Sequence, residues 1–151
     1  MTNTMKELIN KTPIYIRVEN EDDDKIHFYM SDGKQVTMSH DQDCCESVQI
    51  EDINGDLNKL LYHPITRADE KVDNTAYEDF DDDGDRYTPE SCTYTFYTLA
   101  SRGGYVDIRW YGESNGYYSE SVDIEVTDYN INDLPSEVLT KLKSEHPELL
   151  I

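Results

Sequence analysis

The chain has 151 residues and contains 33 Asp and Glu residues against 13 Lys and Arg residues, which gives a formal net charge of -20 at pH 7. A surface of fixed carboxylates repels phosphates and anionic headgroups over the roughly 8–10 Å Debye length, so direct binding to nucleic acid or to a membrane is disfavoured. Because 36% of the residues are hydrophobic and 11% are aromatic, the chain can bury a core, and we expect one folded domain over residues 1–151 instead of an acidic tail.

Apolar residues alternate with polar ones in the first third of the chain, which predicts antiparallel strands. One strand is expected around residues 14–18. Residues 25–39 predict a hairpin, because Asp32 and Gly33 form a turn-favouring pair between two alternating runs. The apolar residues between positions 53 and 61 recur with helical spacing, which predicts a short central helix or turn.

A second group of strands is expected in the last third of the chain, separated by two glycine-containing turns. These strands cover residues 93–99, 105–111 and 117–126. An apolar stripe bounded by prolines predicts a C-terminal helix over about residues 134–146, and the acidic segment over about residues 73–91 predicts a loop. The fold class is therefore α+β and mainly β, with an antiparallel sheet built of hairpins and a meander, the short central helix and the C-terminal helix.

The three cysteines, Cys44, Cys45 and Cys92, form no regular metal-binding or disulfide pattern. An odd number of cysteines without a paired spacing favours a reducing compartment, so we expect the cytoplasm. The N-terminal residues lack the apolar core of a signal peptide, and no run approaches the ~18 apolar residues of a membrane span. We therefore expect a protein that is neither exported nor embedded in a membrane.

Two long and unusual segments, HDQDCCESV at residues 40–48 and IRWYGESNGYYSE at residues 108–120, are similar to the signature stretches of a family of small phage and prophage proteins. The resemblance covers roughly residues 40–124. It implies a viral accessory protein that acts in the cytoplasm of a bacterial host, and it supplies no catalytic or cofactor assignment.

The acidic segment also fits the spacing of a calcium-binding loop, in which alternate oxygen ligands surround a glycine. Gly84 occupies the glycine position, but Pro89 and the strand expected after it do not fit an EF-hand. A solvated acidic loop is the alternative interpretation, and apart from this candidate Ca²⁺ site we expect no cofactor. The candidate ligands are Asp79, Asp81, Asp83, Asp85 and Glu90.

The first signature segment contains a candidate base, His40, and two candidate nucleophiles or soft metal ligands, Cys44 and Cys45. An enzyme or a small-ligand sensor built on the His40–Glu46 segment is therefore one alternative. Against catalysis, the neighbouring carboxylates disfavour a reactive thiolate, and adjacent cysteines on a strand point to opposite faces. The competing interpretation is that an aspartate of this segment caps a turn and that the cysteines pack as small buried groups.

The second signature segment is rich in tyrosine beside Asn, Ser and Gly, a composition typical of recognition loops. The alternation predicts that Trp110 faces the core and that its neighbours face outward. The alternative is that the tyrosine rings only cover the sheet. Candidate partner-binding residues, with the acidic residues of other segments included, are Asp41, Asp43, Glu46, Glu51, Asp52, Asp81, Asp82, Asp83, Arg109, Tyr111, Glu113, Asn115, Tyr117, Tyr118 and Glu120.

The chain contains no glycine-rich phosphate loop, nucleophile elbow, HExxH pair or kinase signature, so we do not expect an enzyme. We expect a phage-encoded acidic interaction protein that inhibits or modulates a basic host protein involved in nucleic-acid handling or defence. Rows of carboxylates would stand in for the phosphates of DNA or RNA, so that the protein mimics nucleic acid without binding it. A calcium-binding β module is the alternative from another class, beside the enzyme or sensor described above.

Overall fold

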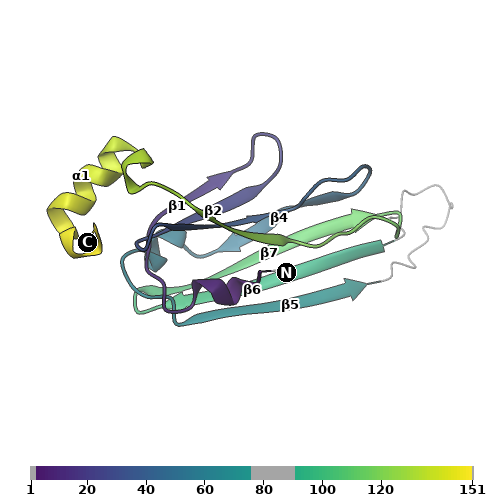
Figure 1. The fold of residues 1–151 in the computed structure, drawn as a ribbon. Helices are drawn as coiled ribbons and strands as arrows, with labels where there is room; N and C mark the ends of the chain where they lie inside the picture. Colours follow the sequence, from purple (N-terminus) through teal and green to yellow (C-terminus); the bar gives the residue numbers. More distant parts are fainter. Residues whose placement is uncertain (1–2, 76–90, 151) are drawn as a thin grey trace.

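The computed structural model describes residues 3–75 and 91–150, and its strands form two antiparallel sheets of four strands each. The first sheet has the order β1-β2-β3-β8, with β1 (Pro13–Glu19), β2 (Lys25–Met30), β3 (Lys34–Ser39) and β8 (Asp123–Asp128). The second sheet has the order β4-β7-β6-β5, with β4 (Ser47–Asn54), β7 (Gly104–Ser114), β6 (Ser91–Ser101) and β5 (Arg67–Thr75). The prediction of a mainly β fold with antiparallel strands is therefore confirmed, with two sheets in place of one (Figure 1).

One hydrophobic core contains buried residues of both sheets. Its largest members include Phe28 from β2 and Tyr97 and Trp110 from β6 and β7. Burial alternates along β7 as the sequence predicts, because successive side chains of a strand point to opposite faces. The outward positions of β7 therefore carry the polar and tyrosine residues of the second signature segment.

Helical structure among the described residues consists of one α-helix and four 3-10 helices. The helix α1 (Ser136–Glu145) confirms the predicted C-terminal helix, and its Leu142 packs with Ile14 and Leu134 in a second apolar cluster. No helix in the described part of the chain is long and apolar enough to cross a membrane. The 3-10 helices are η1 (Met5–Leu8), η2 (Leu57–Leu60), η3 (Ile131–Asp133) and η4 (Pro147–Leu150).

The predicted central helix is only the single turn of η2. Asp56 ends the extended chain and caps this turn, because its carboxylate accepts the N–H of Asn58 at 2.9 Å. Ile53, which fits the helical spacing in the sequence, belongs instead to β4.

The strand predicted over residues 117–126 begins later than expected and has a different partner. β8 starts at Asp123 and pairs with β3, where Val126 lies opposite Val36. No hairpin forms at Asn115 and Gly116, because residues 115–122 cross from the second sheet to the first. This crossing places the second signature segment at one end of the two sheets. Two strands, β4 and β5, are not predicted from the sequence.

Candidate functional site

The two signature segments meet at one end of the molecule. The first forms the loop between β3 and β4, and the second continues from β7 into the crossing segment that leads to β8. His40 donates a hydrogen bond from Nδ1 to the carbonyl oxygen of Ser121 at 2.7 Å, and the N–H of Asp41 donates to the carboxylate of Asp123 at 2.9 Å. These two bonds join the first signature segment to residues that closely follow the second, although some 80 residues of sequence separate the bonded partners.

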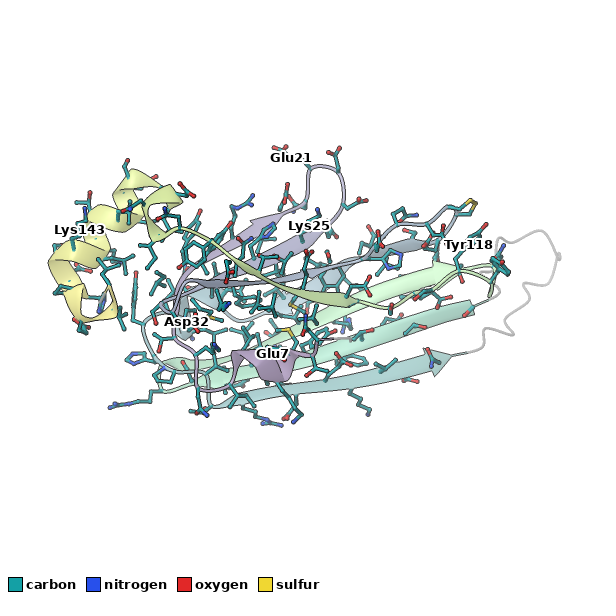
Figure 2. The ribbon with its side chains drawn as sticks, viewed as in Figure 1. Glu7, Glu21, Lys25, Asp32, Tyr118 and Lys143 are labelled. Carbon is teal, nitrogen blue, oxygen red and sulfur yellow. A yellow bond between two sulfur atoms is a disulfide. The ribbon has the colours of Figure 1, made fainter. Side chains whose placement is uncertain are left out.

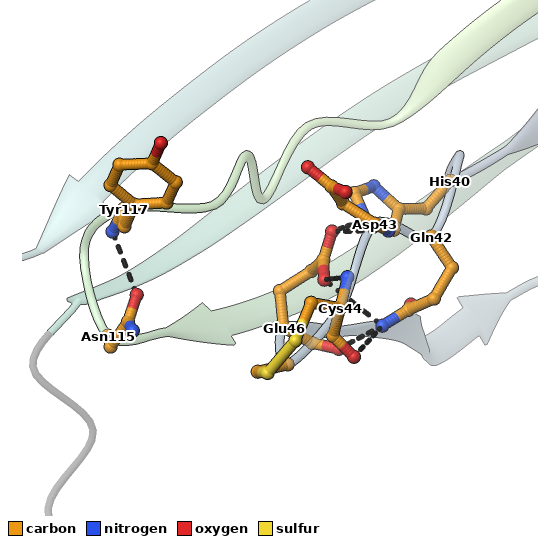
Figure 3. Close-up of a disulfide and its surroundings, with 8 residues drawn as sticks. His40, Gln42, Asp43, Cys44, Glu46, Asn115 and Tyr117 are labelled. Atoms are coloured by element: carbon orange, nitrogen blue, oxygen red, sulfur yellow. Dashed lines mark hydrogen bonds and ion pairs between the residues drawn. A yellow bond between two sulfur atoms is a disulfide. The ribbon is translucent and has the colours of Figure 1, made fainter.

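Glu46 is the centre of the first loop. Its side chain is fully buried, and one carboxylate oxygen lies 2.9 Å from Nε2 of His40 (Figure 3). The backbone N–H groups of Asp43 and Cys44 donate to the carboxylate at 3.0 and 2.9 Å, and Gln42 donates from its side-chain amide at 3.1 Å. These donors therefore replace the hydrogen bonds that water would give to the carboxylate, and together the bonds fix the path of the loop.

The hydrogen bonds around Glu46 stabilise its charged form. Burial alone raises the pKa of a carboxyl group, but the bonds from His40 and from the backbone N–H groups outweigh burial and lower the pKa of Glu46 to about 2. Both ring nitrogens of His40 face acceptors, the carbonyl oxygen of Ser121 and the carboxylate of Glu46. The arrangement is that of a buried, hydrogen-bonded carboxylate with a structural role.

The two adjacent cysteines are placed differently from the sequence expectation. Cys44 and Cys45 are joined in a disulfide, and both residues are exposed at the tip of the loop (Figure 3). The expectation of small buried groups is therefore wrong, since the chain turns at this point instead of continuing as a strand. In this state neither residue has a thiol to act as a nucleophile or metal ligand. Cys92 is outside the disulfide and buried, and its pKa is raised by burial and by Glu120.

A second buried carboxylate, Glu120, organises the crossing segment. It accepts hydrogen bonds from the hydroxyls of Thr93 (2.7 Å) on β6 and Ser114 on β7. Ser114 in turn accepts the N–H of Gly116 at 3.0 Å, so the turn after β7 is tied to the same carboxylate. Gly112 allows the close approach, because a Cβ at this position would lie 2.9 Å from the Cβ of Glu120. Neither Glu46 nor Glu120 is therefore part of the exposed acidic surface.

The outer face of the second sheet carries several of the predicted partner-binding residues. Arg109 on β7 forms an ion pair at 2.8 Å with Glu51 on β4, and both side chains are partly exposed. The hydroxyl of Tyr111 donates to Glu113 at 3.0 Å, and its ring lies 5.0 Å from that of Tyr94. Burial and this hydrogen bond raise the pKa of Tyr111, which keeps the phenol neutral. Most of these polar groups are therefore paired within the molecule.

The tyrosines of the crossing segment differ in exposure. Tyr117 is 83% exposed, the largest exposure among the large hydrophobic residues that the structure describes, and its N–H donates to the side chain of Asn115 at 2.9 Å (Figure 3). Tyr118 is half-buried and its ring packs against that of Tyr117 with centroids 5.1 Å apart. Both rings lie at the end of the molecule opposite the C-terminal helix, where Figure 2 labels Tyr118.

An acidic turn that the sequence prediction did not include lies between β1 and β2. Glu21, Asp22 and Asp23 are exposed at its tip, and Figure 2 shows Glu21 protruding from the sheets. The fourth acid, Asp24, folds back and accepts the N–H of Ile50 at 2.7 Å, which holds the turn against the edge strand β4. The signal for this surface is an unbroken run of four acidic residues in the sequence.

The calcium hypothesis concerns residues outside the described part of the chain. The candidate ligands Asp79, Asp81, Asp83, Asp85 and Glu90 all lie between positions 75 and 91, as does the candidate partner-binding residue Asp82, so both assignments stay predictions. Within residues 3–75 and 91–150, no group of three or more His, Cys, Asp or Glu side chains is arranged to hold a metal ion. The acids at positions 41, 43 and 52 are exposed on the surface.

The fold and this site define a small acidic protein of two antiparallel sheets, with two buried carboxylate networks at one end. Residues 6–124 match a domain of unknown function, DUF7448, and because the match covers most of the chain, the protein belongs to this family. The matched range includes both signature segments. No curated protein and no solved structure matches the chain.

Proposed function

We propose that this protein is an acidic interaction protein that binds the basic surface of a nucleic-acid-handling protein and competes with its DNA or RNA. The observation that carries the proposal is the acidic β1–β2 turn. Its three exposed acids protrude together, and the hydrogen bond from Ile50 to Asp24 holds the turn in place before any partner binds. A carboxylate array that is fixed in advance loses less conformational entropy on binding than a mobile one does.

The distribution of ion pairs also supports the exposed acids as the surface that contacts the partner. Several basic side chains of the described residues are already paired with carboxylates of this chain, whereas no described Lys, Arg or His lies within ion-pair distance of the acids at positions 21–23, 41, 43 and 52. These unpaired carboxylates project a negative field that accelerates association with a basic partner. The pairs are Lys11–Asp32, Arg17–Glu19, Lys34–Asp128, Arg67–Asp69 and Arg109–Glu51.

We also propose that the protein is encoded by a phage and acts inside the bacterial host. The resemblance of the two signature segments to phage and prophage proteins supports an accessory protein that acts in the cytoplasm of a bacterial host. There it would inhibit or modulate a host protein that handles nucleic acid or provides defence. Exposed carboxylates would occupy the positions of phosphates, which duplex DNA carries at about one charge per 1.7 Å of helix axis.

The test is a competition measurement. The protein is used to capture partners from a bacterial lysate, and the purified partner is bound to a fluorescently labelled oligonucleotide. We expect increasing amounts of this protein to displace the oligonucleotide while not binding it directly. The proposal fails if saturating protein leaves the oligonucleotide bound, or if this protein itself raises the anisotropy of the free oligonucleotide.

A pair of charge-matched variants locates the contact surface. Changing Glu21, Asp22 and Asp23 to Lys alters the β1–β2 turn, whereas changing Asp133, Glu137 and Glu145 to Lys alters net charge equally around the C-terminal helix. We expect the turn variant to weaken displacement about 10-fold more than the helix variant does, because close charge pairs at an interface contribute more than distant charge. Equal losses would mean that only the overall charge matters and would remove the turn from the proposed interface.

A further inference from the structure

A pocket of about 380 Å³ opens beneath the crossing segment, between that segment and the β5–β6 side of the second sheet. Glu70 and Asn74 of β5, Thr93 and Tyr97 of β6, and Tyr118 and Glu120 of the crossing segment line it. This volume is within the range of about 300–1,000 Å³ typical of small-ligand sites. The pocket is separate from the acidic β1–β2 turn.

Glu120 brings a buried negative charge to this pocket. The residue is 8% exposed, and the two hydroxyl donors already described bind its two carboxylate oxygens. No described Lys, Arg or His lies within ion-pair distance of it. A buried carboxylate without a counter-charge is costly, and each of its oxygens can accept a further hydrogen bond. The pocket therefore favours a positively charged donor.

Tyr97 brings a buried hydroxyl to the same pocket. The residue is 1% exposed, and its hydroxyl makes no hydrogen bond of ordinary geometry among the described residues, although the carboxylate of Glu70 lies close enough to interact with it. Its side chain shares the inner face of β6 with Thr93, since residues two and four apart on a strand point the same way. Burial and the carboxylate of Glu70 raise the pKa of Tyr97, so the phenol is neutral and its oxygen can accept a hydrogen bond.

We propose that this pocket binds a guanidinium or primary ammonium group, carried by a small molecule or by the tip of a protein side chain. Glu120 supplies the counter-charge, the Tyr97 oxygen accepts one N–H of the ligand, and Glu70 adds a second carboxylate. Such cations carry three to five N–H donors and no acceptor, which complements a pocket rich in acceptors. An anion would meet two carboxylates and is excluded by repulsion. This inference does not depend on the proposed function.

The first test is an NMR titration of the ¹⁵N-labelled protein with ethylguanidinium and with the neutral analogue ethylurea, at about 150 mM salt to screen general attraction. We expect ethylguanidinium to shift the amide signals of Thr93, Tyr97 and Glu120 in a saturable way, and ethylurea to leave them unchanged. Shifts scattered over the acidic surface, or no saturable shift, would overturn the proposal.

Variants separate this pocket from the general charge of the protein. Glu120→Gln removes the charge and keeps the size of the side chain, so we expect ethylguanidinium to bind about 10-fold or more weakly, as for other hydrogen bonds to charged groups. Glu137→Gln on α1 removes one exposed charge far from the pocket and should leave binding unchanged. Equal binding by the two variants would refute the assignment. If Glu120→Gln does not fold, Tyr97→Phe and Glu70→Gln make the same comparison.

A further arm distinguishes the source of the cation. The titration is repeated with the peptide Gly-Gly-Arg-Gly-Gly, in which the guanidinium is attached to a backbone. Tighter binding of this peptide than of ethylguanidinium identifies a protein side chain as the ligand, and tighter binding of ethylguanidinium identifies a small molecule. If neither compound shifts the signals of the pocket residues, the proposal is wrong.

Discussion

The buried carboxylate of Glu46, in the first signature segment, makes the stability of the folded protein depend on pH in the acid range. Its ordinary pKa of 4.5 falls to about 2 in the folded protein, so the folded state holds the charged form more tightly than the unfolded chain does. The stabilisation is therefore complete above about pH 4.5 and is lost as the pH falls towards 2. Glu46 thus stabilises the fold above about pH 4.5, and the loss of this stabilisation promotes unfolding in acid.

Glu46→Gln is expected to destabilise the protein at pH 7 and to flatten the decline of Tm between pH 4.5 and 2. Thermal unfolding followed by circular dichroism over this pH range measures both effects. Asp43→Asn is the matched control, because Asp43 bonds to Glu46 through its backbone N–H and its side chain is exposed. An unchanged pH profile in Glu46→Gln would show that the buried charge of Glu46 does not stabilise the fold.

The absence of a side chain at Gly112 allows the segment around the second buried carboxylate, Glu120, to pack closely against β7. A Cβ at this position would lie 2.9 Å from the Cβ of Glu120, closer than Cβ atoms approach one another in proteins, and 3.1 Å from Cγ2 of Val48, which is a tight contact. Gly112→Ala should therefore force the crossing segment away from β7 and cost about 1–3 kcal/mol, as overpacking usually does. Urea denaturation measures this loss. A variant as stable as the parent would mean that the crossing segment moves aside without cost.

At the level of single elements, the sequence predicted those strands whose apolar residues alternate. β6 and β7 bury every second residue over most of their length, and in β2 and β3 the apolar residues fall at every second position, although His27 and Thr37 between them are buried as well. β5 was not predicted because Ala68 is the one buried residue among residues 67–74, although the strand pairs with β6 over its nine residues. Its position depends on pairing, which a local pattern does not encode.

β4 was not predicted for a different reason. The pairing with β7 shifts between Ile50 and Asp52, so a bulge places Glu51 out of register. The apolar residues before and after the bulge then fall at positions 48, 50 and 53, which breaks the period of two. Similarly, the apolar residues of β8 indicate a strand but not its partner, and the sequence could not show that β8 joins the other sheet.

For the candidate site, too, the sequence indicated the segments involved but not the contacts between distant parts of the chain. The resemblance grouped the residues around Glu46 and those around Glu120 into two segments, and the structure brings these segments together. The burial of both carboxylates could not be predicted, because acidic residues are usually exposed. They are buried here because distant segments provide their donors, as Thr93 on β6 does for Glu120.

At the scale of the whole molecule, the net charge of -20 opposes folding and favours association with cations. Most carboxylates of the described residues are exposed, so their mutual repulsion is a long-range effect that added salt screens. The Debye length falls from about 30 Å at 10 mM salt to about 8 Å at 150 mM. Repulsion within the protein and attraction to a basic partner should therefore weaken together.

We expect the Tm of the isolated protein to rise, and its affinity for a basic partner to fall, when salt increases from about 10 to 150 mM. The two trends are measured by differential scanning calorimetry and by surface plasmon resonance with the captured partner. Choline chloride replaces NaCl in a parallel series, so that screening is separated from specific binding of a small metal cation. A Tm that is constant or falls in both salts would show that charge repulsion does not limit the stability of the fold. A partner affinity that is independent of salt would contradict an interface built on the exposed carboxylates.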